Sequence, residues 1–547
     1  MRDLYSGAER YLADKASLLI RNGRIYTVDK KRSWAQALAA DGGRIAFVGT
    51  DKQAEEYAGP HTKVVDAKGR LVLPGFIDSH VHFASGYMET SWVNLNSASS
   101  LEDMFGMMSE HARKHPDSRL VGGFGWEYEA AQSKGGLPKR TDLDEVVSDR
   151  PVWLISYDGW VGLANSRFTG LAEKALREKS SILGGMERDP RTGEPTGVFY
   201  DPYDLAYLGG DISELIRENE VEGLKEIIGQ ATVYGITSVH DAQTDIKDIE
   251  SLEQLRNDGA LNVRVYNALY YTRETGEQDL VRFKEAKSRY SDEWIKAGAV
   301  KLFIDGVPES HTAAMLEAYS DDPTVKCEPK FTPERFNEIV EELDRMGFQC
   351  LIHACGDRGV RIALDACENA LMRNGRRDSR HRIEHIEVIS DRDIPRFKQL
   401  GVIASMQPEH MESSPDSNYY RAVGEDRMRR AFRWRSLSRA GAILAFSSDW
   451  YVASLNPLIG MHGAVTRERG PGEDQKIPLE EAIEAYTING AYASFEEDIK
   501  GSLEPGKLAD IVILSDNLFE MPPNGIREVE VLMTILGGNE IYRSQKF

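Results

Sequence analysis

GFIDSHVHF, residues 75–83, is a short apolar segment that carries two histidines near its end. Successive side chains of a β-strand point to opposite faces, so His80 and His82 lie on the same face of such a strand. Two imidazoles on one face supply half of a site for zinc or a similar divalent ion. A single strand-end histidine is more often structural than a ligand, and His-x-His alone is a weak signal. The segment therefore predicts a buried strand, and a metal site only if further ligands lie elsewhere in the chain.

Seven similar segments follow, and helical stretches separate most of them. Several are almost entirely apolar up to a polar end, which is typical of parallel strands buried on both faces. Eight such strands with intervening helices predict an α/β fold, a (β/α)8 TIM barrel. An open doubly wound sheet is the alternative, and it is disfavoured because no Gly-rich phosphate loop follows the first strand. The seven segments are ITSVHDA (236–242), VRVYNAL (263–269), AVKLFIDG (299–306), CLIHACG (350–356), RIEHIEV (382–388), VIASMQP (402–408) and ILAFSSD (443–449).

Both ends of the chain have the pattern of small β-structures. The N-terminal part contains short apolar runs separated by turns, and the pairs Asn22-Gly23 and Gly42-Gly43 between these runs are typical of hairpins. Similar runs, DIVILSD and VLMTILGGNEIY, return near the C-terminus. Because chain termini often lie close together, we expect residues 1–73 and 500–547 to form one composite β-sandwich domain.

The barrel is then expected at residues 74–499, interrupted by a long insertion. The stretch of about 84–235 is too long for a single βα loop after the first strand. It contains a predicted helix at 101–115 and a predicted strand at 151–159. We interpret it as an insertion on the C-terminal face of the barrel, where it would cover the substrate.

Polar residues stand at the C-terminal ends of the predicted strands, and in a barrel such residues project into one site. Structural needs alone would not align so many polar ends in barrel order, so the set favours a metal site. Its members are His80, His82, His240, Lys301, His353, His385 and Asp449.

Lys301 is the unusual member of this set. An ammonium beside metal ions would be repelled, but CO2 can carbamylate the lysine into an anionic ligand with two oxygens that bridges two metals. The alternative is an ordinary buried amine paired with Asp305. Two other patterns, His111 with His115 and the basic run RNGRRDSRHR (373–382), are interpreted as solvated segments rather than as metal or phosphate sites.

Composition excludes several classes of partner. The 547 residues include 67 Lys+Arg against 88 Asp+Glu, a net charge of −21, which argues against nucleic-acid binding and against an anionic membrane surface. No apolar run has the length of about 18 residues that a transmembrane helix needs, and the first residues do not resemble a secretory signal. The 4 cysteines form no disulfide framework, so we expect reduced thiols and a cytoplasmic location. The expected partner is a small-molecule substrate, and a homodimer is expected on base rates alone.

The motifs resemble a known family. LVLPGFIDSHVHF resembles the metal-dependent amidohydrolase superfamily, and further motifs resemble its amidohydrolase family 3 branch, which includes N-substituted formamide deformylase-like proteins. The resemblance spans about residues 17–545 and is specific for family and fold, but it does not fix the substrate. The further motifs are RDPRTGEPTGVF (188–199), GITSVHDA (235–242), VKLFIDG (300–306), HACGDRGV (353–360), HRIEH (381–385), SMQPEH (405–410), SSDW (447–450) and GSLEPGKLADIVIL (501–514).

This resemblance implies a barrel with a companion β-sandwich and one or two divalent metals per chain, zinc being the expected ion. It implies that His80 and His82 bind the more buried metal with Asp449. His353 and His385 would bind the more exposed metal.

The resemblance also implies that carbamylated Lys301 bridges the two metals, but the chain departs from the branch in two places. Where the branch often has Asp-Gly-His inside the insertion, this chain has Asp158-Gly159-Trp160. Where it often has an arginine after the fourth strand, this chain reads ESHTAA, with His311. The first departure replaces a hydrogen-bond donor with an apolar ring and indicates a different or more aromatic substrate.

The expected activity is hydrolysis of a C–N bond in an amide, formamide or cyclic amide. Metal-bound hydroxide would attack the carbonyl carbon, with Asp449 as general base and then general acid. His240 would assist the oxyanion or orient a ligand, with support of a neighbouring ligand as its simpler role. A deaminase, an ester or lactone hydrolase, and a catalytically silent binding protein are the alternatives. The candidate substrate-binding residues, of which the aromatic ones could instead be core residues of the insertion, are Trp126, Trp160, His311 and His410.

Overall fold

Eight parallel strands form the centre of the computed structural model, which describes residues 15–131, 136–178, 185–200, 204–207, 210–411, 414–467 and 474–547. Each of the eight segments predicted from the sequence contributes one strand, and the strands lie side by side in chain order. They are β8 (Phe76–Val81), β15 (Ile236–Thr244), β16 (Arg264–Tyr270), β17 (Ile295–Phe303), β18 (Gln349–Ala354), β19 (Arg382–His385), β20 (Ile403–Met406) and β21 (Leu444–Phe446).

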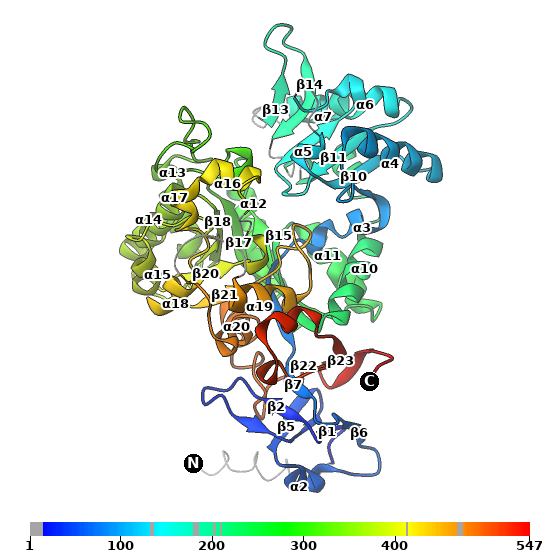
Figure 1. Cartoon of the computed structure of the whole chain (residues 1–547), viewed down its shortest axis with the longest axis vertical. Helices are drawn as coiled ribbons and strands as arrows, with labels where there is room; N and C mark the ends of the chain where they lie inside the picture. Colours follow the sequence, from blue (N-terminus) through cyan, green and yellow to red (C-terminus); the bar gives the residue numbers. More distant parts are fainter. Residues whose placement is uncertain are drawn as a thin grey trace.

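Backbone contacts close this sheet into a barrel. A parallel bridge joins Val81 to Trp450, and the N–H of Asp449 donates to the carbonyl of His80 at 2.9 Å. The last strand segment therefore lies against the first, and the predicted (β/α)8 barrel is confirmed. Figure 1 shows the barrel between the insertion and the terminal sheets, with β8 in blue and the later strands in green, yellow and orange.

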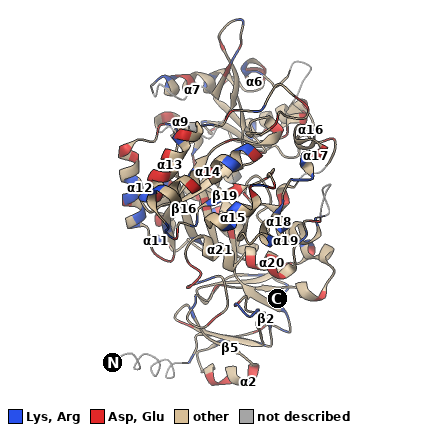
Figure 2. Ribbon diagram, turned by 90° about the vertical axis from the view of Figure 1, so that its left-hand side faces the viewer, with Lys and Arg blue, Asp and Glu red and all other residues tan. Residues whose placement is uncertain are grey.

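Helices cover the outside of the barrel, and α13 (Pro333–Arg345) shows why they form where they do. Its N-cap is Thr332, whose side chain accepts a hydrogen bond from the N–H of Arg335 and satisfies a donor of the first turn. Its buried apolar residues recur at helical spacing, and they are Phe336, Ile339, Val340 and Leu343. The next helix, α14 (Asp357–Asn374), packs beside it, and Figure 2 shows acidic and basic residues along both helices.

A second sheet belongs to the insertion and lies beyond the barrel, at the top of Figure 1. Its order is β13-β14-β12-β11-β10-β9, and α4 (Leu101–Lys114), α6 (Arg140–Val146) and α7 (Ser166–Glu178) pack with it. The strands are β9 (Val93–Asn94), β10 (Val121–Trp126), β11 (Val152–Ser156), β12 (Val161–Ala164), β13 (Met186–Arg188) and β14 (Pro195–Tyr200).

The expected insertion boundary near residue 235 is not matched by the packing. Helix α10 (Glu220–Val233) buries Leu224, Ile227 and Ile228 in the same apolar cluster as the barrel. The helix before β15 therefore belongs to the barrel wall, because its apolar face has the barrel as its partner.

Strands from both chain ends form two small sheets at the bottom of Figure 1. In the sheet β24-β23-β22-β7-β2-β3, the N-terminal strand β7 pairs antiparallel with the C-terminal strand β22. The other sheet has the order β5-β4-β1-β6, and one apolar cluster lies between the two. The strands are β1 (Leu18–Arg21), β2 (Arg24–Tyr26), β3 (Trp34–Ala35), β4 (Ala37–Asp41), β5 (Arg44–Gly49), β6 (Lys63–Asp66), β7 (Leu71–Pro74), β22 (Ile511–Leu514), β23 (Val531–Leu536) and β24 (Asn539–Arg543). Residues 1–14 of the expected sandwich lie outside the described residues.

One of the two predicted hairpins is wrong. Gly42-Gly43 does join paired antiparallel strands, β4 and β5. Asn22-Gly23 instead separates β1 from β2, which belong to different sheets. A two-residue type I′ turn needs positive φ at both central positions, and of this pair only Asn22 has one, at 52°.

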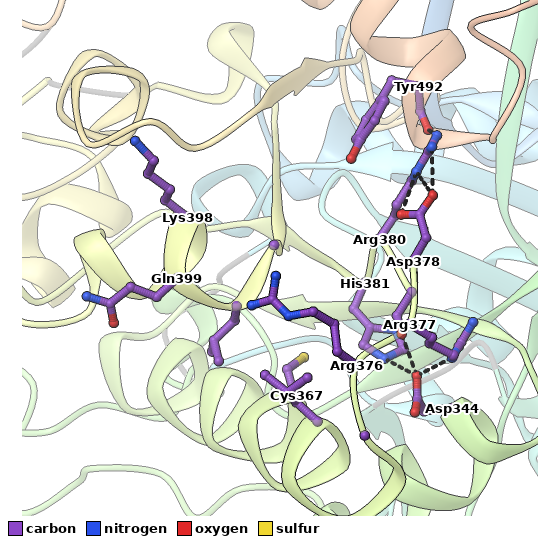
Figure 3. A pocket seen from close by; sticks show the side chains of 15 residues that line it. Asp344, Cys367, Arg376, Arg377, Asp378, Arg380, His381, Lys398, Gln399 and Tyr492 are labelled. Carbon is purple, nitrogen blue, oxygen red and sulfur yellow. Dashed lines mark hydrogen bonds and ion pairs between the residues drawn. The ribbon is translucent and has the colours of Figure 1, made fainter.

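The interpretation of residues 373–382 as a solvated segment is also wrong in part. Arg382 is fully buried inside the barrel. Arg377 donates to Asp344 at 2.7 Å, and His381 and Ser379 contact the same carboxylate. Figure 3 shows this network beside a cavity of about 340 Å³ at the N-terminal end of β19. Residues 377–381 are therefore held in place by Asp344, a buried acid that lies outside the basic run in the sequence.

Asp344 is expected to make part of the folding stability sensitive to acid. Burial alone would raise the pKa of Asp344, but hydrogen bonds from His381, Ser379 and Asn374 outweigh it and hold the pKa below its usual value. A lowered pKa in the folded state means that the stabilisation is present above the unfolded value of about 3.9 and is lost as the pH falls. Asp344→Asn should therefore lower stability at pH 7 and flatten the loss of stability between about pH 5 and pH 2. Urea titrations over this range measure it, and equal slopes for the two proteins would contradict it.

Among the described residues, no helix combines the length and the apolarity needed to cross a bilayer.

Candidate metal centre

The carboxyl ends of the barrel strands bring the predicted metal ligands together. Every one of these side chains is at least nine-tenths buried, and all except His80 line one cavity, with His80 fully enclosed beside it. The set is His80 in β8, His82 just after it, Lys301 in β17, His353 in β18, His385 at the end of β19 and Asp449 after β21.

The tightest group consists of His80, His385 and Asp449. One donor atom from each lies within 4.8 Å of the others. His82 is close to them, with Nε2 3.0 Å from Oδ1 of Asp449. The Nε2 atom of His385 is buried and has no hydrogen-bond partner in the described structure. A cation at this point would satisfy that lone pair, so the residues fit a divalent metal.

Hydrogen bonding to His80 supports the same conclusion. Its Nδ1 lies 2.6 Å from Oε2 of Glu384, so Nδ1 carries the proton and Nε2 presents a lone pair. Burial and the nearby Lys301 lower the pKa of His80 to about 4, which keeps the ring neutral. Nε2 lies 3.4 Å from Oδ1 of Asp449, a pair of acceptors that fits a cation, and the group that contacts Nε2 in this structure is Nζ of Lys301 at 3.1 Å.

Glu384 and Arg382 position His80, and the sequence analysis did not single them out. Arg382 donates through Nε to Oε1 of Glu384 at 2.8 Å, and both side chains are fully buried. A carboxylate that holds the second nitrogen of a ligand histidine is common at metal sites. The two residues alternate along β19 and so share a face, which is the signal in the sequence that could have identified them.

Glu384→Gln is expected to weaken metal binding by about ten- to a hundredfold, because the amide would no longer hold His80 in one tautomer and orientation. Competition with a chelator of known affinity measures this, with circular dichroism as a check on folding. Glu334→Gln, on the exposed first turn of α13, is the control and should leave affinity unchanged. Wild-type affinity in a folded Glu384→Gln protein would contradict the positioning role.

Lys301 does not form the ordinary ion pair that was the alternative prediction. Its Nζ lies 3.1 Å from Nε2 of His80, and burial lowers its pKa to about 8. Asp305 is occupied elsewhere, since its oxygens accept the N–H groups of Cys355, Gly356 and Ala314. The pairing with Asp305 is therefore wrong, because that carboxylate anchors the loop after β18.

Two donors of the centre adopt backbone conformations that are unusual for residues other than glycine. His385 has φ 74° and Asp449 has φ 59°. Such conformations cost about 1–3 kcal/mol each and persist where surrounding contacts enforce them. Here the N–H of Asp449 donates to His80, and the N–H of the neighbouring Ser448 donates to Asp78. The unusual backbone conformations therefore occur at His385 and Asp449, two residues whose side chains point to the candidate metal centre.

The cavity beside the donors has aromatic and acidic walls. The Trp160 ring lies 5.1 Å from the His353 ring, and Phe303 lies 4.9 Å from the same histidine. Asp158, Glu309 and Glu387 line the cavity as well. Burial raises the pKa of Glu309 to about 8, with the nearby Asp158 as a further cause.

The structure brings two of the four predicted substrate-binding residues to this cavity, Trp160 and His410. Trp126 is instead fully buried in the apolar core of the insertion, where its ring packs against Tyr128. His311 forms an ion pair with Asp321 at 2.8 Å. Neither Trp126 nor His311 lines the cavity.

His240 does not reach the cavity either, which corrects its predicted role on the oxyanion. Its Nδ1 lies 2.8 Å from Nη1 of Arg382, and its ring packs edge-on against Tyr266. It is fully buried within the barrel. The simpler predicted role, support of a neighbouring ligand, remains. His240 contacts Arg382, Arg382 contacts Glu384, and Glu384 contacts His80.

Gln243, Glu309, Glu387 and Cys355 line the cavity and were not predicted to do so. Cys355 has Sγ 3.5 Å from Nε2 of His353. Gln243 and the two glutamates lie at or beyond strand ends. The sequence there has no periodic pattern that would indicate in which direction these side chains point. No sequence signal distinguishes them from other loop residues.

A (β/α)8 barrel that gathers buried His and Asp donors at its carboxyl end has an arrangement that suits a metal-dependent hydrolase. The sequence model of the amidohydrolase family matches residues 63–542, and the chain belongs to this family.

Relatives and solved structures are similar to the chain over nearly its whole length. The chain is 32% identical to "Protein LONG AFTER FAR-RED 3" of Arabidopsis thaliana, over 99% of this chain and 95% of that protein. It is 27% identical to the N-substituted formamide deformylase of Arthrobacter pascens, over 95% and 97%. The crystal structure of an uncharacterized metal-dependent hydrolase from Pyrococcus horikoshii superimposes with a TM-score of 0.73 at 25% identity, covering 92% of this chain and 99% of the other.

Proposed function

We propose that the protein hydrolyses a C–N bond in an amide, formamide or cyclic amide. The observation that carries the proposal is the convergence of His80, His385 and Asp449 at the carboxyl end of the barrel, with donor atoms within 4.8 Å of one another. The likeness to an N-substituted formamide deformylase over nearly the whole chain supports the C–N subclass.

The donor set would hold one or two divalent ions, zinc being the expected one. His80, His82 and Asp449 would hold the first ion, and His353 and His385 would hold the second. A bound ion supplies Lewis acidity, lowering the pKa of a water molecule and polarising a carbonyl group.

Lys301 would complete the set as a carbamate. A lysine with a pKa of about 8 is neutral in an appreciable fraction of molecules near pH 7, and the neutral amine is the form that attacks CO2. The N–C bond forms as one N–H proton leaves, and the product carries a negative charge and two oxygens. This replaces the ammonium, whose charge would oppose a cation in the same place.

Asp449 would move the proton of the reaction. Burial would raise the pKa of Asp449, but His80, His82 and His385 outweigh it and keep the pKa well below its usual value. The carboxylate is therefore ionised and can accept a proton from the attacking water and pass it to the leaving nitrogen. Trp160 and Phe303 would exclude bulk water from the same cavity.

A substrate panel tests the reaction type. Formamides, linear amides and cyclic amides are assayed beside amino-heterocycles, esters and lactones, with the metal-loaded protein. Formation of a carboxylic acid and an amine from members of the first group, both on one ring-opened product for a cyclic amide, supports the proposal. Ammonia release from amino-heterocycles, or turnover of esters and lactones alone, would contradict it and favour a deaminase or an ester hydrolase. Binding of panel members without turnover by metal-loaded protein would favour a binding protein.

A further inference from the structure

The cavity has a wall of three carboxylates that the proposed hydrolysis does not use. Asp158 follows β11 of the insertion, Glu309 lies in the short helix η5 (Pro308–Ser310), and Glu387 follows β19. All three line the cavity beside the metal centre, and we refer to them as the acidic wall. They come from three separate parts of the chain, so no single loop explains their convergence.

Two members of the acidic wall have oxygens without partners. Glu387 is 5% exposed, and its Oε2 is buried without a hydrogen-bond partner. Glu309 accepts one hydrogen bond, from the hydroxyl of Tyr157 at 3.2 Å, while its own Oε2 has none. Neither glutamate belongs to an ion pair among the described residues, and the neighbours that interact with Glu387 are the thiol of Cys355 and the hydroxyl of Tyr419. A buried carboxyl group in this state takes up a proton unless a cation meets it, in agreement with the raised pKa of Glu309, and a bound cation would stabilise the charged form.

Gln243 gives a second, independent indication of a ligand. Its side chain is 1% exposed and lines the same cavity at the end of β15. Both its amide nitrogen and its amide oxygen are buried and lack hydrogen-bond partners. Buried amides are nearly always paired, so a bound molecule with an acceptor and a donor would complete this one.

We propose that the substrate carries a cationic nitrogen group, an amine or an amidine, that binds to the acidic wall. Gln243 pairs with a neutral polar edge of the same molecule. The proposal rests on the proposed function for the position of the scissile bond, which lies at the metal donors. The nearby Lys330, whose Nζ is 4.5 Å from the Trp160 ring centre, is not among the residues that line the cavity.

The dimensions of the site restrict this group. The cavity that the acidic wall shares with the metal donors has a volume of about 50 Å³. A second cavity of about 440 Å³ shares Val452 with it and is lined by Asn94, Asn96 and Glu127 of the insertion. The cationic group is therefore small, and the larger cavity takes the rest of the molecule.

Acetamidinium and acetamide test the proposal as a pair of probes with the same shape and different charge. Their affinities for the metal-loaded protein are measured by ligand-observed NMR at constant ionic strength. Acetamidinium is expected to bind at least about tenfold more tightly, because charge-assisted hydrogen bonds are the stronger ones. Glu309→Gln should bring the two affinities to within about twofold, and Glu334→Gln on α13 should leave the preference intact.

Equal affinities in the wild-type protein would overturn the proposal, as would a preference that survives in both Glu309→Gln and Glu387→Gln. Metal content is measured for each variant, because Glu387 is close in sequence to His385. A charge preference without hydrolysis of any amide would leave this inference standing and contradict the proposed function. Faster hydrolysis of neutral amides than of their amino-bearing counterparts would support the proposed function and contradict this inference.

Discussion

Asp449→Asn is expected to lower kcat by about a hundred- to ten-thousandfold while most of the bound metal is retained. The asparagine keeps an oxygen that can face a cation, but it cannot accept the proton of the attacking water. The large effect follows from the place of this side chain, 3.0 Å from His82 and 3.4 Å from His80 at the cavity wall. Steady-state kinetics on an amide that the panel identifies, with elemental analysis of the same sample, measures both quantities.

The control for this variant is Asp321→Asn, which removes a carboxylate that pairs with His311 away from the cavity. Its kcat should match that of the wild-type protein within about twofold. Full turnover by Asp449→Asn with full metal content would show that another group moves the proton. Loss of the metal along with turnover would restrict Asp449 to the role of a ligand.

Lys301→Ala is expected to remove at least one metal ion per chain and to abolish the effect of bicarbonate on metal loading. Wild-type protein stripped of metal and reloaded should take up more metal with bicarbonate present, because the carbamate forms from CO2. The alanine variant has no amine and should load equally with and without bicarbonate. Loading is measured by elemental analysis after gel filtration.

Lys296→Ala is a matched control, since it removes a partly buried lysine that bonds to the carbonyl of Ser494, away from the donors. It should keep the wild-type response to bicarbonate. A Lys301→Ala protein with the metal content of the wild type would contradict the carbamate and leave Lys301 as an ordinary amine.

The barrel could be predicted from the sequence because its signals are local. An apolar run with a polar end identifies a buried parallel strand, and β8 with its two histidines is a clear case. The strand ends of a barrel converge by topology, so the donors could be grouped before any geometry was known. The same reasoning placed Lys301 and His385 in one site without showing what holds them.

Other features depended on contacts between distant segments. Lys301 and Asp305 are close in sequence, but Asp305 accepts a hydrogen bond from the loop after β18. Lys301 contacts His80 instead. Trp126 and Trp160 both belong to the insertion, and only the path of its sheet decides which of them reaches the cavity. The acidic wall could not be predicted for the same reason.

The proposed chemistry requires a bound metal, and elemental analysis of wild-type protein purified without chelator, with bicarbonate present, tests this most directly. About two divalent ions per chain is the predicted result, since six buried donors converge at one end of the barrel. No stoichiometric metal, even after reconstitution with zinc and bicarbonate, would contradict the account.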